Sequence, residues 1–346
     1  MKIEKVVIDG CCFRSDKFSG AQRYAMEILQ ELDRLVPMGK YELLINPKHK
    51  ALLNLQNIRK VELKAHSKLF RYIEIFFYII RNNALYVHWE NGVALRKNSI
   101  ITLHDIYAFY GVCNNTRWYY FKKKCKAVID VIVAKHIVTV SEFSKKTILD
   151  SLPISSDKIS VIYNGWQHIK RVESDEFFLE KMNLTSQSYY FFIGRLVNNK
   201  NIKWIFNVAD NNPNSIFVIA GALSNEKFDF YPGKNENIIY TGFISDSEMK
   251  ALYQNCKAFL FPSLMEGFGI PPMEALYNGA PIIISNTSSL PEVYEDSAHY
   301  INPMKYDYCL DDLLNEPVCS PEKILNKYSW ETSAQQWYDL IESYLK

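Results

Sequence analysis

Short runs of apolar residues alternate with longer amphipathic stretches along the whole chain. The apolar runs are rich in Val, Ile, Phe and Tyr, which is typical of buried strands that lie between covering helices. The pattern predicts strands at residues 6–8, 43–46, 85–89, 100–104, 136–140 and 159–163, and again at 189–193, 216–220, 238–241, 258–261 and 282–285. We therefore expect an α/β fold with doubly wound parallel sheets.

A polar segment, residues 168–187, interrupts this alternation, and we interpret it as a linker followed by a helix. The chain has 346 residues, enough for two domains. We predict an N-terminal domain of residues 1–170 and a C-terminal domain of residues 171–328. A last helix follows at residues 329–346, where Trp330, Trp337 and Ile341 share one face.

The net charge of +2 hides an asymmetry between the two halves of the chain. Residues 1–170 contain 27 Lys and Arg against 15 Asp and Glu, a net charge of +12, and residues 171–346 contain 13 against 23, a net charge of −10. The near-neutral total argues against a nucleic-acid-binding protein, and the basic half indicates an anionic partner. The seven Cys are scattered without metal-binding spacing, which indicates reduced thiols in the cytoplasm and no metal site.

One motif follows the predicted strand at 258–261. Glu266 precedes the turn Gly267-Phe268-Gly269, and Glu274 lies in the helix that begins after it. Glycines let backbone N–H groups approach a ligand closely, and a helix N-terminus attracts phosphate. Two carboxylates at this spacing can bind hydroxyls on two parts of one ligand; the open alternative is that they only cap or pair near the helix.

A second motif follows the strand at 189–193, where Arg195 and Lys200 lie on one loop before a helix. An arginine binds phosphate oxygens as a fork and a lysine as a point charge. The alternative is two ordinary surface cations. The loop lacks the glycine patterns of dinucleotide-binding folds and P-loops, which disfavours both.

Together these segments resemble glycosyltransferase family 4, the retaining GT-B glycosyltransferases. EGFGIPPMEA is similar to the family's E-x7-E signature, and FIGRLVNNKNI is similar to its diphosphate-binding element. Seven further segments fit in order, from SGAQRYAMEILQEL through ITLHDI, VTVSEFSKKTI, VIYNG, IIYTGFISDSEM and SSLPEV to YSWETSAQQW. The resemblance extends over almost the whole chain.

The resemblance implies a GT-B fold, with two Rossmann-like domains and a cleft between them. The first domain would bind the acceptor, the second would bind the nucleotide sugar, and the last helix would pack back on the first domain. The implied catalytic residues are Glu266, His104, Lys200 and Arg195. The implied donor-binding residues are Arg195, Lys200, Glu274, Gly267, Phe268, Gly269, Ile270, Phe243 and Gly20.

Each implied role has its own chemistry. Arg195 and Lys200 would neutralise the donor diphosphate in place of a metal, so no cofactor is expected beyond a UDP-, GDP- or dTDP-sugar as substrate. Glu274 would bind the ribose, Glu266 the sugar, and Phe243 would lie beside the base. His104 would reach the donor sugar, although a hydrogen-bonded core histidine is the alternative, and the Gly20 loop would face phosphate and acceptor.

Two departures from the family pattern stand out. The first loop has Ser19-Gly20 where the family often has two glycines, and Trp166-Gln167 stands where Val-Asp is common. The first puts the phosphate approach near Ser19 in doubt, and the second removes a carboxylate.

We expect a retaining glycosyltransferase that acts on a glycan or lipid-diphosphate-linked glycan in bacterial surface polysaccharide synthesis (O-antigen, capsule or exopolysaccharide). The alternatives are another GT-B enzyme, such as an epimerase or phosphorylase, or a non-catalytic subunit that binds sugar nucleotides. We expect a cytoplasmic protein. The basic and aromatic residues 117–126 and the apolar run 72–80 suit an anionic membrane surface on the inner face of the cell membrane. A solvated helix face and a buried helix remain the equal alternative.

Overall fold

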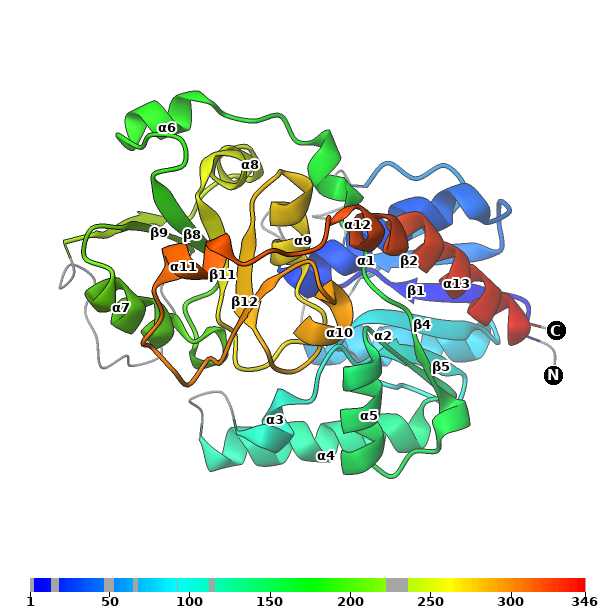
Figure 1. The fold of residues 1–346 in the computed structure, drawn as a ribbon. Helices are drawn as coiled ribbons and strands as arrows, with labels where there is room; N and C mark the ends of the chain where they lie inside the picture. Colours follow the sequence, from blue (N-terminus) through cyan, green and yellow to red (C-terminus); the bar gives the residue numbers. More distant parts are fainter. Residues whose placement is uncertain are drawn as a thin grey trace. The chain divides into compact units, whose positions relative to one another are not determined.

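The computed structural model describes residues 3–13, 19–46, 53–64, 68–91, 93–111, 116–221 and 236–345. The chain divides into two units (Figure 1). Unit 1 comprises Met1–Phe109, Arg117–Gly165 and Tyr328–Lys346, and unit 2 comprises Tyr110–Thr116 and Trp166–Lys327. Each unit is built around one parallel sheet, which confirms the predicted α/β fold.

The described residues of unit 1 form a seven-stranded sheet in the order β3-β2-β1-β4-β5-β6-β7. Its strands are β1 (Val6–Asp9), β2 (Tyr41–Ile45), β3 (Arg59–Glu62), β4 (Leu85–Asn91), β5 (Ser99–Thr102), β6 (His136–Thr139) and β7 (Ile159–Val161). Its helices are α1 (Gly20–Leu35), α2 (Lys68–Arg81), α3 (Tyr107–Tyr110), α4 (Arg117–Val133), α5 (Glu142–Ser151) and α13 (Trp330–Ser343). The sequence pattern missed only β3 among these strands.

Helices cover both faces of this sheet. The β1–β2 and β3–β4 connections run in opposite directions across the sheet, so right-handed crossovers place α1 and α2 on opposite faces. The strand register puts Tyr86 of β4 and Ile101 of β5 on the same face. Ile75 of α2 packs in the cluster around Tyr86, and Val131 of α4 packs in the cluster around Ile101. Both α2 and α4 therefore lie on one face.

The C-terminal helix α13 packs against α1 within unit 1. The indole N–H of Trp337 donates to the hydroxyl of Tyr24 at 2.7 Å. The start of this helix lies so close to Gly165 that a Cβ atom at position 165 would lie 2.2 Å from the backbone nitrogen of Trp330. Only glycine fits this approach, which explains the glycine in the segment VIYNG.

The described residues of unit 2 form a six-stranded sheet in the order β10-β9-β8-β11-β12-β13. Its strands are β8 (Tyr189–Ile193), β9 (Ile216–Ala220), β10 (Ile238–Gly242), β11 (Ala258–Phe261), β12 (Ile282–Ser285) and β13 (His299–Ile301). Its helices are α6 (Phe177–Lys181), α7 (Ile202–Asn211), α8 (Asp246–Asn255), α9 (Ile270–Tyr277), α10 (Leu290–Tyr294), α11 (Leu310–Asn315) and α12 (Glu322–Lys327). The predicted linker contains a short 3-10 turn, Gln167–Arg171, and α6.

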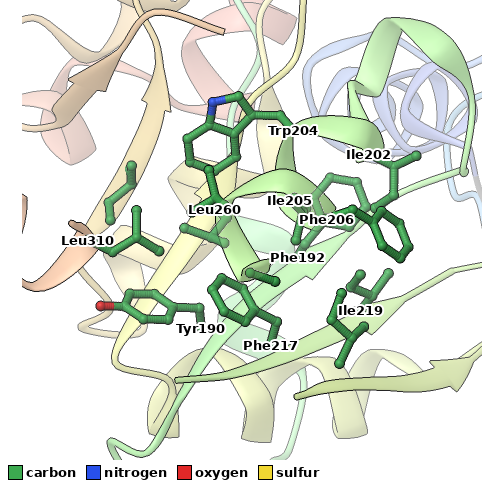
Figure 2. Close-up of a cluster of buried hydrophobic side chains, with 14 of the residues drawn as sticks. Tyr190, Phe192, Ile202, Trp204, Ile205, Phe206, Phe217, Ile219, Leu260 and Leu310 are labelled. Carbon is green, nitrogen blue, oxygen red and sulfur yellow. The ribbon is translucent and has the colours of Figure 1, made fainter. Parts of the chain in front are cut away.

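The core of unit 2 is rich in aromatic side chains. Figure 2 shows Tyr190 and Phe192 of β8 and Phe217 of β9 packed with Trp204 of α7 in one buried cluster. The Trp204 indole N–H still finds an acceptor, the carbonyl of Lys305 at 2.7 Å. This core fixes α7 against the sheet, and so fixes the loop that leads from β8 into α7.

Candidate functional site

The loops that follow β8 and β11 lie side by side at the carboxyl end of the unit 2 sheet. The two strands are neighbours, and the amide of Leu264 donates to the carbonyl of Asn199 at 2.8 Å. The first loop carries Arg195 and Lys200, and the second carries Glu266. In open α/β sheets, this end is where ligands bind.

Lys200 and Glu266 are in direct contact. The Lys200 Nζ lies 2.6 Å from the Glu266 Oε1, and the two side chains are 20% and 8% exposed. The same Nζ lies 4.9 Å from the centre of the Phe261 ring, a cation–π contact. A lysine ammonium has three N–H donors, so the contact with Glu266 leaves two for an anion. Arg195, on the same loop, is exposed.

Glycine occupies the ends of neighbouring strands where the backbone packs closely. Gly221 follows β9 with a φ of +134°, and a Cβ atom there would lie 1.9 Å from the carbonyl oxygen of Gly194. Its amide donates to the carbonyl of Gly242 at 2.8 Å. No larger residue fits at position 221. This constraint was not predicted, although a glycine directly after a strand is a recognisable signal. Phe243, after Gly242, is 59% exposed.

The N-terminus of α9 is braced by the next loop. Gly269 caps the helix with a φ of +87°, and a Cβ atom there would lie 2.8 Å from the Leu290 side chain. The hydroxyl of Ser289 donates to the Glu266 carbonyl at 3.1 Å, and the hydroxyl of Tyr294 donates to the Gly269 carbonyl. The turn from Gly267 to Ile270 is thereby held at the positive end of the helix dipole.

Glu274 has different surroundings from Glu266. Its carboxylate is buried, with Oε1 2.6 Å from the His168 Nε2, and it accepts a hydrogen bond at Oε2 from the Tyr253 hydroxyl at 3.0 Å. Burial raises the pKa of Tyr253, and the nearby Glu274 raises it further, so the phenol remains a donor. Neither His168 nor Tyr253 was predicted as a partner.

His104 follows β5 in unit 1. Its Nε2 lies 2.8 Å from the carbonyl oxygen of Trp89, so this nitrogen carries the proton. Burial lowers the pKa of His104 to about 4, so the ring is neutral near pH 7 and Nδ1 is an acceptor. The contact with Trp89 is what the core-histidine alternative predicts, and it also fixes the ring with one acceptor nitrogen.

Gly20 is the first residue of α1 and is exposed. Ser19, which replaces a family glycine, caps this helix in a reciprocal pair with Gln22. The Ser19 hydroxyl accepts from the Gln22 amide at 3.4 Å, and the Ser19 amide donates to the Gln22 side chain at 2.9 Å. The first departure from the family pattern therefore has a structural reason.

A buried carboxylate, that of Asp9, lies with its hydrogen-bonding partners at the carboxyl end of β1 and β4. This group was not predicted from the sequence. Asp9 accepts from the Tyr86 hydroxyl at 2.6 Å and from the Cys11 amide at 2.8 Å, and its Oδ2 lies 3.4 Å from the His88 Nε2. Burial alone would raise the pKa of Asp9, but His88 and the hydrogen bonds outweigh it and hold that pKa below its ordinary value. Asp9 is therefore ionised.

The structure thus joins some of the predicted site residues and separates others. Lys200 and Glu266 are in contact, and Arg195, Phe243 and the turn 267–270 follow strands at the same end of the unit 2 sheet. Glu274 is buried within unit 2, and His104 and Gly20 belong to unit 1. Within the described ranges, no three His, Cys, Asp or Glu side chains gather in a way that could hold a metal ion.

Two family profiles match the chain in succession. The profile of Glycosyltransferase Family 4 matches residues 18–167, and that of Glycosyl transferases group 1 matches residues 174–303. The structure resembles the Anabaena protein HepE, solved in complex with UDP and glucose, with a TM-score of 0.75 and 14% identity over 98% of this chain and 100% of that one. This likeness shows the GT-B fold.

Curated relatives match the chain in part. The chain is 32% identical over 228 residues to the O-antigen chain mannosyltransferase RfbU of Salmonella typhimurium, over 64% of this chain and 62% of that protein. It is 29% identical over 228 residues to O-antigen chain mannosyltransferase B of Escherichia coli, over 61% and 59%. The chain thus spans less than two thirds of either relative. With both profiles and the fold in agreement, the chain belongs to glycosyltransferase family 4, the glycosyl transferases group 1.

Proposed function

We propose that the protein is a retaining glycosyltransferase that moves a sugar from a nucleoside-diphosphate sugar to a hydroxyl of a glycan. The contact between Lys200 and Glu266 supports this most, because it joins two family motifs at one end of one sheet. A shielded lysine, an exposed arginine and a helix N-terminus together suit a diphosphate.

In this proposal, Lys200 and Arg195 bind the diphosphate of the donor. When the bond between sugar and phosphate breaks, negative charge grows on the leaving nucleoside diphosphate. The two cations and the positive end of α9 stabilise that charge, which lowers the barrier. The acceptor hydroxyl attacks from the face that the leaving group vacates and gives its proton to a phosphate oxygen of the leaving diphosphate. The anomeric configuration is therefore retained, and no metal ion takes part.

The remaining residues orient the donor. Glu266 holds Lys200 through Oε1 and accepts a sugar hydroxyl through its other oxygen. The carboxylate of Glu274, held in place by His168 and Tyr253, is the group that we assign to the ribose hydroxyls. Phe243 lies against the base, and His104, neutral with Nδ1 as acceptor, suits a sugar hydroxyl.

The names of the curated relatives guide the choice of substrate. Both relatives described above are O-antigen mannosyltransferases, so we propose that mannose is transferred and that the product is a bacterial surface polysaccharide. A growing glycan on a lipid diphosphate suits the acceptor role and brings the protein to the inner face of the cell membrane as a peripheral protein.

A thermal-shift screen tests the donor assignment. UDP-, GDP- and dTDP-linked sugars, with mannose first, are added to the protein with and without EDTA. One of them should raise the melting temperature by a few degrees at saturation, equally in EDTA. Lys200→Ala should abolish the shift, and Lys181→Ala, an exposed lysine on α6, should keep it.

A transfer assay with the donor identified in this way then tests the reaction. The configuration of the product is determined by NMR, and it should match that of the donor. A protein that is stabilised by no nucleotide sugar, or that needs a divalent metal ion for transfer, would contradict the proposal.

A further inference from the structure

Two helices of unit 1 present apolar side chains to solvent. Of the sixteen exposed large hydrophobic residues in the described part of the chain, nine lie on α2 and α4. They are Leu69, Ile73, Phe77 and Ile80 on α2, and Trp118, Tyr119, Phe121, Ile129 and Ile132 on α4. Such a concentration on two elements is unusual for a monomeric surface and indicates a binding surface.

The apolar residues of α2 form one outward stripe. Leu69, Ile73, Phe77 and Ile80 follow one another at helical spacing, so they share a face. The opposite face carries Ile75 and Ile79, which are fully buried in the core of unit 1. The helix is therefore apolar on both its inner and its outer side, and only the inner side is explained by packing.

Helix α4 is likewise apolar on both its inner and its outer side. Its outer stripe is mostly aromatic at one end. Trp118 and Phe121 stack with ring centres 5.5 Å apart, and Ile129 and Ile132 continue the stripe toward the end of the helix. The inner side packs through Val131 in the sheet core. Since α2 and α4 cover the same face of the sheet (Figure 1), their outer stripes point away from it on the same side.

Positive charge surrounds these stripes. The two helices contain eight Lys and Arg but only two acidic residues. Asp130 is buried and paired with Lys126, and Glu74 accepts the amide of Lys64. Lys122 lies 5.0 Å above the Trp118 ring and Lys123 lies 5.6 Å from the Tyr119 ring. The exposed charge is thus basic and sits next to aromatic rings.

We propose that these outer stripes of α2 and α4 with their flanking lysines, the α2–α4 face, dock on an anionic lipid bilayer. Both helices lie in the plane of the interface, with Phe77, Trp118 and Phe121 at the level of the headgroups and Lys122–Lys124 on lipid phosphates. No described helix is long and apolar enough to cross a membrane, so the contact is peripheral.

The charge distinguishes a bilayer from a second copy of the chain. A symmetric dimer through this face would place the same patch on both sides and bring the lysine clusters together, which is repulsive. An anionic surface neutralises them instead. The proposal stands on unit 1 alone, since vesicle binding is measured without nucleotide sugar, and it would survive the failure of the donor assignment.

Vesicle co-sedimentation of the full chain tests the proposal. The protein should pellet with phosphatidylcholine vesicles that contain phosphatidylglycerol, much less with phosphatidylcholine alone, and added salt should release it. Lys122→Gln with Lys123→Gln should weaken partitioning roughly twenty-five-fold, because each lysine near an anionic surface contributes about a fivefold factor. Phe77→Ser should weaken it about tenfold, since the buried aromatic area is lost.

Matched controls lie on unit 2. Lys181→Gln with Lys305→Gln removes the same charge from exposed positions, and Phe177→Ser removes an 81% exposed phenylalanine; both should bind vesicles like the wild type. Phe77 is itself 63% exposed, so Phe77→Ser leaves the core intact. A wild-type protein that stays in the supernatant overturns the proposal, as does equal loss in the controls.

Analytical ultracentrifugation addresses the second copy directly. The wild type and Phe77→Ser should have the same sedimentation coefficient in the absence of lipid. If Phe77→Ser instead dissociates a dimer and leaves vesicle binding unchanged, the α2–α4 face is a contact between copies and the bilayer proposal is wrong.

Discussion

In both units a glycine follows the first strand, and its amide donates a hydrogen bond to the neighbouring strand. In unit 1 the Gly10 amide donates to the Leu44 carbonyl at 2.8 Å, and in unit 2 the Gly194 amide donates to the Ala220 carbonyl at 3.1 Å. The residues around these glycines differ. In unit 1, Asp9 precedes Gly10 and is buried among hydrogen-bond donors. In unit 2, Arg195 follows Gly194 and is exposed, and Lys200 lies on the same loop. The backbone arrangement is the same in both units. The charged side chain beside the glycine is a buried carboxylate in unit 1 and an exposed cation in unit 2.

This difference shows how one architecture provides two kinds of site. A strand end only brings loops together, and the side chains on those loops decide what can bind there. The cations of unit 2 are available to an anion from outside. The carboxylate of Asp9 is already satisfied by Tyr86, Cys11 and His88, and the imidazole of His104 is neutral, so this end of unit 1 favours neutral hydroxyl groups.

The largest expected effect is on catalysis and comes from removing the Lys200 cation of unit 2. Lys200→Ala should lower kcat/KM by roughly a thousandfold, because the leaving diphosphate loses a charge-assisted donor in the transition state. It should also leave Glu266 as an unpaired, shielded carboxylate. Steady-state kinetics with the matched donor measure the effect, and Lys181→Ala serves as the control. Unchanged turnover in Lys200→Ala would contradict the assignment of the donor diphosphate to this loop.

The next effect addresses the buried carboxylate of unit 1. Asp9→Asn should destabilise the protein by about 3 kcal/mol near neutral pH, because it replaces a buried, hydrogen-bonded carboxylate with an amide that brings an extra donor. The exposed Asp150→Asn, on α5, should change stability little. Urea unfolding followed by tryptophan fluorescence measures both variants.

The Asp9 effect should also depend on pH. The pKa of Asp9 is held below the ordinary 3.8, so its contribution is complete above that pH and is lost as the pH falls through the lowered value. The difference between wild type and Asp9→Asn should therefore shrink in acid. A difference that grows in acid would mean that Asp9 is protonated in the folded protein.

The sequence predicted most of the fold because buried strands have a strong apolar pattern. It missed β3 and β13, and both are edge strands of their sheets. The strand β3 reads Arg-Lys-Val-Glu, and β13 has three residues. An edge strand pairs on one side only and is often polar or short, so its signal is weak.

For the site, the sequence predicted Lys200 and Glu266 because each lies in a local motif at a strand end. It did not predict that His168 and Tyr253 hold Glu274, or that Tyr86 and His88 surround Asp9. These partners are far apart in sequence, and only the packing of strands and helices brings them together. Spacing along the chain carries no information about such pairs.

A smaller effect tests the neutral imidazole of unit 1. The ordinary pKa of histidine is 6.5, and burial lowers that of His104 to about 4, so between these values the unfolded chain binds a proton that the folded protein does not. His104 therefore contributes stability that is complete above the ordinary pKa and is lost as the pH falls toward the lowered one. Between about pH 7 and about pH 5 the wild type should lose about 2 kcal/mol that His104→Asn does not lose. Parallel losses in the two proteins would contradict a ring that is neutral in the folded protein.

The smallest expected effect separates base binding from charge stabilisation within unit 2. Phe243 is exposed beside Gly242 and is assigned to the nucleobase, far from the reacting bond. Phe243→Ala should raise the donor KM by roughly fivefold through lost stacking and leave kcat unchanged. Phe177→Ala, at an 81% exposed phenylalanine on α6, should change neither constant. A fall in kcat as deep as that of Lys200→Ala would place Phe243 at the reacting diphosphate. The separation of base recognition from charge stabilisation in unit 2 would then be wrong.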